Sequence, residues 1–185
     1  ARAIAGIECA LVDITARSHG VSVAQLLGGP TRDRIRLYWS HCGTTRVRHP
    51  EIVGKPPIKT FDDVTALAKE VVARGFTALK TNIVMPGQGA TWASGLDGSM
   101  GPNDEWVSNA LLSHIEKHIG TIRDAVGPDF DINLDLNFHF KPEACMRIAQ
   151  VLEPYNLHWL EIDTPDPDAL RQIKDSTSTK ICTGE

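Results

Sequence analysis

The chain has 185 residues, of which 42% are hydrophobic and 23% charged, and these proportions are typical of a soluble globular domain. Its net charge of −4 and pI near 6.0 argue against a nucleic-acid partner, which requires a basic face. No apolar run is long enough to cross a membrane, and the first residues lack the order of a signal peptide. We therefore expect a cytoplasmic protein with no membrane partner.

The four cysteines lie far apart in the sequence and form no CxxC pair. Such spacing does not indicate a disulfide framework or a zinc site in a chain of this size. Their neighbours are apolar, so we expect buried free thiols at all four positions. These are Cys9, Cys42, Cys145 and Cys182.

The spacing of apolar residues predicts an amphipathic helix over residues 3–17 and a short helix over 23–27. Alternation of large residues over 34–42 predicts a first strand. From there strands and helices alternate to the end. We expect helix 60–75, strand 76–84, helix 103–127, strand 131–138, helix 141–155, strand 158–163, helix 167–176 and strand 180–184.

This alternation implies a parallel sheet covered by helices. The pattern alone leaves two architectures open, a doubly wound sheet and a (β/α)₈ barrel. Five strands cannot close a barrel of eight, so a barrel would be incomplete in this chain. Two long segments rich in Gly and Pro, 43–59 and 85–102, follow the first two strands, and we expect them on the face where α/β proteins build ligand sites.

Polar residues gather where the predicted strands end. Three successive strands carry a carboxylate there, and carboxylate oxygens suit a hard divalent cation, Mg²⁺ first and Mn²⁺ second. Asp163 has two open interpretations, a displaced site acid or a cap of the next helix. The residues in question are Lys80 and Asn82 on the second strand, Asp135, Asn137 and His139 on the third, Glu161 and Asp163 on the fourth, and Glu185 on the fifth.

Short motifs add a family resemblance that runs nearly end to end. The chain carries "ALVD" and "LLGG" near its start, then "GFTALKTN", "LDLN", "WLE" and "TGE" in order. It resembles the enolase superfamily, in the mandelate racemase and muconate lactonizing enzyme branch that includes sugar-acid dehydratases. The resemblance implies that residues 1–30 end an α+β capping domain and that 31–185 form about five βα units of an enolase-type (β/α)₈ barrel.

The same resemblance implies roles for individual residues. Lys80 matches the first lysine of the family's KxK motif, which adds positive charge near the substrate carboxylate. Asn82 stands where the second lysine would act as a base and is a catalytic candidate. Asn137, a candidate substrate-binding residue, occupies the position of a histidine found in many dehydratases, and His139, two residues further on, is a candidate acid. The implied Mg²⁺ ligands are Asp135, Glu161 and Glu185.

These features predict a Mg²⁺-dependent lyase that removes the α-proton of a carboxylate substrate and dehydrates an acid sugar. Asn82 weighs against the alternative of a racemase or epimerase. A degenerate member that only binds acid sugars is a further alternative, whereas a zinc hydrolase is disfavoured because the first strand has no HxH. We expect His41 to contact substrate, His114 and His118 to lie on a solvated helix face, and the protein to be a homo-oligomer.

Overall fold

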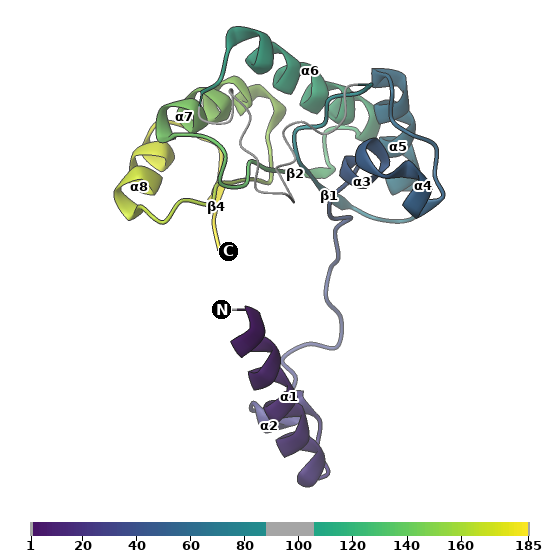
Figure 1. Cartoon of the computed structure of the whole chain (residues 1–185), viewed down its shortest axis with the longest axis vertical. Coiled ribbons are helices and arrows are strands. Elements are labelled where there is room, and N and C mark those ends of the chain that lie inside the picture. Colours follow the sequence, from purple (N-terminus) through teal and green to yellow (C-terminus); the bar gives the residue numbers. More distant parts are fainter. Residues whose placement is uncertain (1, 88–105, 185) are drawn as a thin grey trace. The chain divides into compact units, whose positions relative to one another are not determined.

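The computed structural model describes residues 2–87 and 106–184 (Figure 1). The chain divides into two compact units, Ala1–Arg36 and Leu37–Glu185. Each unit is described by itself. No helix within the described ranges is long and apolar enough to span a membrane.

The first unit contains two helices, α1 (Arg2–Ser18) and α2 (Val23–Leu26). Both match the helices predicted from apolar spacing. The side chain of Ser22 accepts a hydrogen bond from the N–H of Gln25, whose side chain returns one to Ser22, so a complete capping box starts α2. Apolar side chains of α1 are exposed, since so short a unit has too little chain to cover them. They are Ile4, Ile7, Leu11 and Ile14.

The second unit is built on a parallel sheet whose four strands follow chain order. The strands are β1 (Ala78–Thr81), β2 (Asp131–Asp135), β3 (Trp159–Glu161) and β4 (Ile181–Cys182). They correspond to the second to fifth predicted strands. The register sets Asp135 opposite Glu161, and Glu161 opposite Cys182. Because side chains alternate along a strand, this register brings the polar residues of neighbouring strands to one face.

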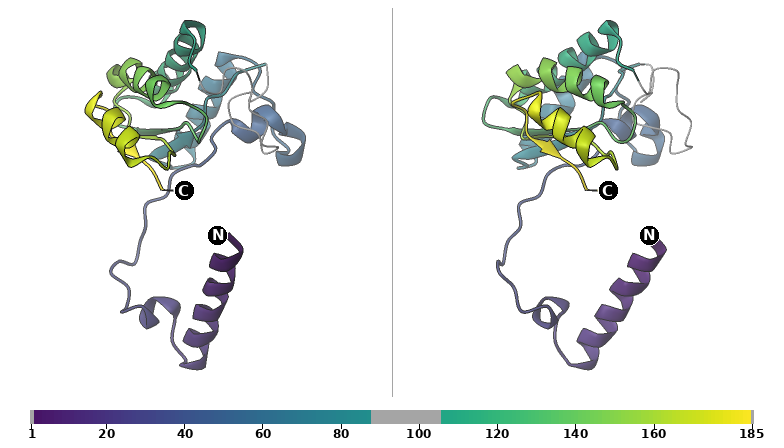
Figure 2. Two further views of the ribbon diagram at one scale, coloured as in Figure 1. Left: turned by 60° about the vertical axis from the view of Figure 1, so that its left-hand side comes forward. Right: turned by 90° about the vertical axis from the view of Figure 1, so that its left-hand side faces the viewer.

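Helices follow each other around the outer side of the sheet (Figures 1 and 2). Neighbouring pairs in the chain, α5 with α6, α6 with α7 and α7 with α8, pack together. This arrangement is a partial barrel in which β1, β2 and β3 each lead to a helix on the outside. The helices are α5 (Phe61–Ala73), α6 (Asn109–Val126), α7 (Pro142–Val151) and α8 (Pro167–Asp175), with a 3-10 turn, η1 (Glu153–Tyr155), after α7.

The core lies between the sheet and these helices. Leu79, Ile132, Leu134 and Leu160 of the strands have no exposed surface. They meet fully buried helix residues, and full burial of one such side chain stabilises a fold by about 1.5–3 kcal/mol. The helix residues with no exposed surface include Val71 of α5, Ile115 and Ile119 of α6, Ile148 of α7 and Ile173 of α8.

The first predicted strand, 34–42, is wrong over most of its length. Only Trp39 bridges to Leu79 of β1, in parallel orientation. His41 then takes a left-handed φ of 48°, which ends any extended backbone. The following segment is not irregular throughout, because it contains two short helices, α3 (Thr44–Arg48) and α4 (Pro50–Val53).

Three other expectations need comment. The predicted loop 85–102 lies almost wholly outside the described residues. The predicted helix 103–127 begins only at Asn109, where Ser108 accepts a hydrogen bond from the N–H of Leu111 and caps α6. Cys42 and Cys145 are buried and unpaired as expected, whereas Cys9 on α1 is exposed.

Candidate active site

Three carboxylates meet at the carboxyl ends of β2 and β3. Asp135, Glu161 and Asp163 each offer an oxygen, and these oxygens lie within 4.8 Å of one another. Asp135 ends β2, Glu161 ends β3, and Asp163 follows two residues later on the same side of the chain. Asp163 is buried, and the interpretation that it caps the next helix is wrong, because Asp166 caps α8.

This donor set fits a hard divalent cation. Ligands on adjacent corners of a Mg²⁺ octahedron, each about 2.1 Å from the ion, are about 3.0 Å apart, so these oxygens would draw closer together around a bound ion. Carboxylate oxygens are also the ligand type that Mg²⁺, Ca²⁺ and Mn²⁺ prefer. The cluster could therefore hold a metal ion. Glu185, the third ligand implied by the resemblance, lies outside the described residues.

The ammonium group of Lys80 lies between two of these acids. Its Nζ is 3.0 Å from Asp135 Oδ2 and 2.9 Å from Glu161 Oε2. The three side chains are 13%, 6% and 15% exposed. Burial by itself lowers the pKa of Lys80, but the hydrogen bonds to Glu161 and Asp135 outweigh burial and raise the pKa above its ordinary value. Lys80 is therefore held in its charged form.

The second oxygen of Asp135 is bound by Asn137. The backbone N–H of Asn137 donates to Asp135 Oδ1 at 2.9 Å, and its side-chain amide donates to the same oxygen at 3.0 Å. These bonds depend on the left-handed φ of Asn137, 54°, which asparagine tolerates better than most residues. The two bonds fix the carboxylate so that Oδ2 faces Lys80.

Asn82 links this acid to the segment after Trp39. Its amide nitrogen donates to Asn137 Oδ1 at 3.1 Å and to the backbone carbonyl of Asp135 at 3.3 Å. Its oxygen accepts from Thr44 Oγ1 at 3.0 Å and from His41 Nδ1 at 3.3 Å. Asn82 is buried, so its whole hydrogen-bonding capacity is used in holding neighbouring groups. A catalytic role for Asn82 stays a prediction.

His139 does not continue the strand that carries Asp135. The strand β2 ends at Asp135, and the chain turns at Asn137 and Phe138. The alternation that would place His139 beside Asp135 therefore stops before reaching it. His139 is half-buried, and its role as an acid stays a prediction.

A cavity of about 230 Å³ lies beside His41, and neither Lys80 nor the three acids line it. Arg46, Lys55 and Arg74 line it together with His41, and Trp39 forms part of its wall. Both arginines also bind Glu70 at 2.7 Å, and Arg74 stacks over the Trp39 ring. The substrate contact expected of His41 stays a prediction, since its observed partner is Asn82.

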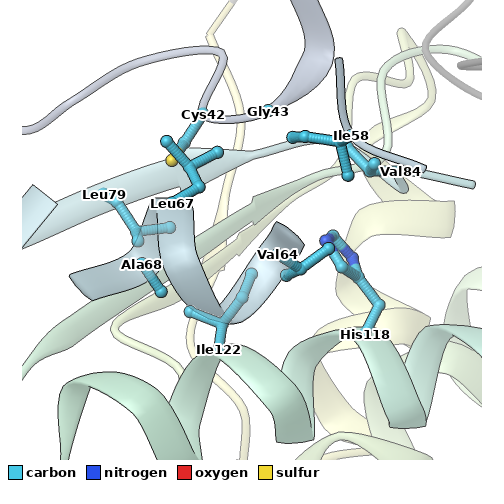
Figure 3. Close-up of a pocket in the computed structure, with 10 residues that line it drawn as sticks. All are labelled: Cys42, Gly43, Ile58, Val64, Leu67, Ala68, Leu79, Val84, His118 and Ile122. Atoms are coloured by element: carbon cyan, nitrogen blue, oxygen red, sulfur yellow. The ribbon is translucent and has the colours of Figure 1, made fainter. Parts of the chain in front are cut away.

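The expectation of a solvated histidine pair on α6 is wrong. His118 is buried, and His114 donates its Nε2–H to the carbonyl oxygen of Val84 at 2.8 Å. His118 lines an apolar cavity of about 10 Å³ between α5, α6 and β1 (Figure 3). That volume is at the lower limit for one water molecule, so the cavity is a gap in the core and not a ligand site.

Sequence reasoning therefore found most of the polar cluster but left Asp163 undecided and missed Thr44. The sequence could have placed Asp163 in the cluster, because it follows Glu161 by two residues and thus shares its side of the strand. No sequence pattern indicates the contact of Thr44 with Asn82, because this bond depends on how the segment after Trp39 folds back.

Comparison with known proteins agrees with this fold. The family described as enolase C-terminal domain-like matches residues 63–185, and the mandelate racemase and muconate lactonizing enzyme N-terminal domain matches 1–28. The chain belongs to the enolase superfamily, in its mandelate racemase and muconate lactonizing enzyme branch. Its partial barrel is the enolase-type (β/α)₈ fold.

Three relatives illustrate the similarity. The chain is 28% identical to a D-galactonate dehydratase family member from Chromohalobacter salexigens, over 99% of this chain and 44% of that protein. It is 30% identical to D-gluconate dehydratase from Thermoproteus tenax, over 100% of this chain and 32% of that protein. A crystal structure from Burkholderia xenovorans, provisionally assigned as an L-alanine-DL-glutamate epimerase and bound to magnesium and fumarate, is 37% identical with a TM-score of 0.87, over 97% of this chain and 45% of that one.

The chain thus spans less than half the length of each of these relatives. It matches proteins named as dehydratases and one provisionally assigned as an epimerase. The two domain matches leave residues 29–62 between them, and the structure divides the chain at Arg36.

Proposed function

We propose that the protein is a Mg²⁺-dependent lyase that removes the α-proton of a carboxylate substrate and dehydrates an acid sugar. The observation that carries this proposal is the clustering of Asp135, Glu161 and Asp163 at the carboxyl ends of neighbouring parallel strands, with Lys80 bound to the first two. Active sites of barrel enzymes are built at that end. The curated relatives named as dehydratases support the reaction class.

In this proposal Asp135 and Glu161 hold the metal together with Glu185, and Mn²⁺ can replace Mg²⁺. A bound divalent cation would neutralise the charge that develops on the substrate carboxylate as the α-proton leaves. Asn137 orients Asp135 through its two hydrogen bonds to Oδ1. Asp163 adds a further negative charge beside these ligands.

The remaining residues act on the substrate. Lys80 supplies positive charge next to the place of the substrate carboxylate, and the role proposed for it is charge stabilisation and not proton removal. Asn82 supports Asn137, and His41 contacts substrate beside it. His139 donates a proton to the departing β-hydroxyl group.

Racemisation or epimerisation is the second candidate. It is supported by the 37% identity with the Burkholderia protein provisionally assigned as an epimerase. Asn82 argues against it, because an amide cannot serve as the second base and its hydrogen bonds are already used within the protein. A degenerate member that binds acid sugars without reaction, and assembly into homo-oligomers, are further hypotheses.

The deciding experiment is a screen of the full-length protein against a library of acid sugars, with Mg²⁺ present and after its removal by EDTA. We expect dehydration of at least one acid sugar, detected as the 2-keto acid product, and loss of turnover without metal. Turnover of Glu161→Gln should fall at least a hundredfold. Glu143→Gln, the same change at an exposed position on α7, should keep full turnover.

A substrate whose α-proton exchanges into D₂O without loss of water would favour epimerisation instead. Binding of acid sugars without exchange or dehydration would identify a non-catalytic binder. Zn²⁺-dependent hydrolysis that survives Glu161→Gln would contradict the proposal altogether.

A further inference from the structure

Lys80 takes the position on the two carboxylates that a metal ion would need. Its ammonium group binds Asp135 Oδ2 and Glu161 Oε2 at nearly equal distances, 3.0 and 2.9 Å. One positive group thus bridges two acids from neighbouring strands, and all three side chains are largely buried. In this arrangement the lysine is the counter-ion that allows two buried carboxylates to lie side by side.

On Asp135, Lys80 binds the oxygen that Asn137 leaves open to another partner. Asp135 Oδ1 already accepts two hydrogen bonds from Asn137, so Oδ2 is the oxygen with capacity for another partner. A divalent ion shared by Asp135 and Glu161 would sit about 2.1 Å from its oxygens. An ammonium group at its present distance from both oxygens would then stand roughly 4 Å from the ion, and a single and a double positive charge repel each other at that distance.

We infer that Lys80 is an internal competitor for the metal site, and that a divalent cation binds Asp135 and Glu161 by displacing the lysine ammonium group. This inference rests on the metal-dependent function proposed above and deepens it. The lysine stem has four flexible carbons, so the ammonium group can move while the backbone of β1 stays in place.

Displacement of Lys80 by the metal sets the order in which metal and acid sugar bind. While Lys80 is paired with two acids, its charge is not available to an anionic ligand. Once displaced, it becomes a free cation close to the metal, where a substrate carboxylate would bind. Metal should therefore bind first, and an acid sugar should bind weakly to protein from which metal has been removed.

The test measures metal binding to the full-length protein and not its turnover. Metal is removed with EDTA, and Mn²⁺ is titrated back while free Mn²⁺ is followed by electron paramagnetic resonance. Lys80→Met keeps the stem and removes the competing charge, so we expect Mn²⁺ to bind at least tenfold more tightly than to the wild type. Lys69→Met, an exposed position on α5, is the matched control and should leave the affinity unchanged.

A second measurement on the wild type covers the case in which Lys80→Met fails to fold. Amine acetylation followed by mass spectrometry should show Lys80 protected without metal and several-fold more reactive with Mg²⁺, while Lys69 reacts equally in both. Equal or weaker Mn²⁺ binding by folded Lys80→Met, or unchanged Lys80 reactivity in metal-loaded wild type, overturns the inference alone. If neither wild type nor variant binds Mn²⁺ or Mg²⁺, the proposed function fails and the inference fails with it.

Discussion

Two buried regions of the second unit shift the pKa of an ionisable side chain in opposite directions. At the carboxyl ends of β1, β2 and β3, Lys80 is buried between two acids and its pKa is raised. Beneath α5 and α6, His118 is buried among apolar side chains and its pKa falls from the ordinary 6.5 to about 3 (Figure 3). Burial opposes charge at both places, but only the first supplies counter-charges.

The first region can hold charged groups, whereas the second belongs to a core that excludes them. Lys80, Asp135 and Glu161 keep charge inside the protein because each partner compensates another. Within the part of the chain that the structure describes, burial lowers the pKa of His118 most, and the neighbouring His114 disfavours its protonation further. Helical spacing alone cannot distinguish these environments. For this reason the prediction of a solvated face for His114 and His118 is wrong.

Removing the lysine from the polar region should give the largest effect on stability. Lys80→Met leaves Asp135 and Glu161 buried beside each other without their counter-ion. Breaking a buried pair in this way costs about 3–5 kcal/mol. Urea unfolding of the metal-free protein should show that loss, and Lys69→Met should change the free energy of unfolding by less than about 0.5 kcal/mol. An equally small change for Lys80→Met would mean that the pair contributes nothing to the fold.

Replacing the amide that supports this region should cost somewhat less. Asn82→Leu keeps a similar volume but leaves Thr44 and Asn137 without their shared partner. Buried polar groups left without a bond cost about 1–3 kcal/mol each, so we expect a loss of about 2–3 kcal/mol in urea unfolding. Asn82→Asp should retain the bond from Thr44 but set a carboxylate oxygen against Asn137 Oδ1 and the carbonyl of Asp135, so it should be destabilised as well. If Asn82→Leu is as stable as wild type, the network is not structural.

In the apolar region, His118 should make the free energy of unfolding depend on pH. The pKa of His118 is lowered on folding, so above about pH 6.5 the residue is neutral in both states and its contribution to stability is complete. As the pH falls from 6.5 toward 3, only the unfolded chain takes up the proton, and stability is lost. The slope is about 1.4 kcal/mol per pH unit for one proton.

Unfolding free energies measured from pH 7 to pH 5 should therefore decline less steeply for His118→Leu than for wild type. His19→Leu, an exposed position in the first unit, is the control and should leave the slope unchanged. Identical slopes for wild type and His118→Leu would show that His118 becomes protonated inside the folded protein.

The smallest effect concerns the start of α5, which contributes Val64 to the cavity beside His118. Thr60 caps this helix by accepting a hydrogen bond from the N–H of Asp63, whose carboxylate accepts one in return from the N–H of Thr60. Thr60→Ala should lower the free energy of unfolding by about 1 kcal/mol, whereas Thr60→Ser should retain the cap. Equal stability of all three proteins in thermal unfolding would exclude a contribution from this cap.

Much of the fold could be predicted because it is encoded locally. Thr60 and Gly75 mark the ends of α5, and the alternation of Ile132 and Leu134 with polar residues marks β2. The strand predicted over 34–42 was wrong because large alternating residues indicate only that a segment can be extended. Whether it pairs along its length depends on its neighbours, and only Trp39 bridges to β1.

For the site, the sequence by itself determined which chemical groups end each strand. A period of two places Asp135, Glu161 and Asp163 at the carboxyl end of the sheet, and motif order indicates the enolase superfamily. Only the tertiary structure decided which of these side chains contact one another. The parallel register brings Glu161 beside Asp135, the left-handed turn at Asn137 supplies both bonds to Asp135, and Lys80 reaches both acids. The contacts of Glu161 and Lys80 with Asp135 join residues far apart in the chain, so their distances follow from packing and not from local propensity.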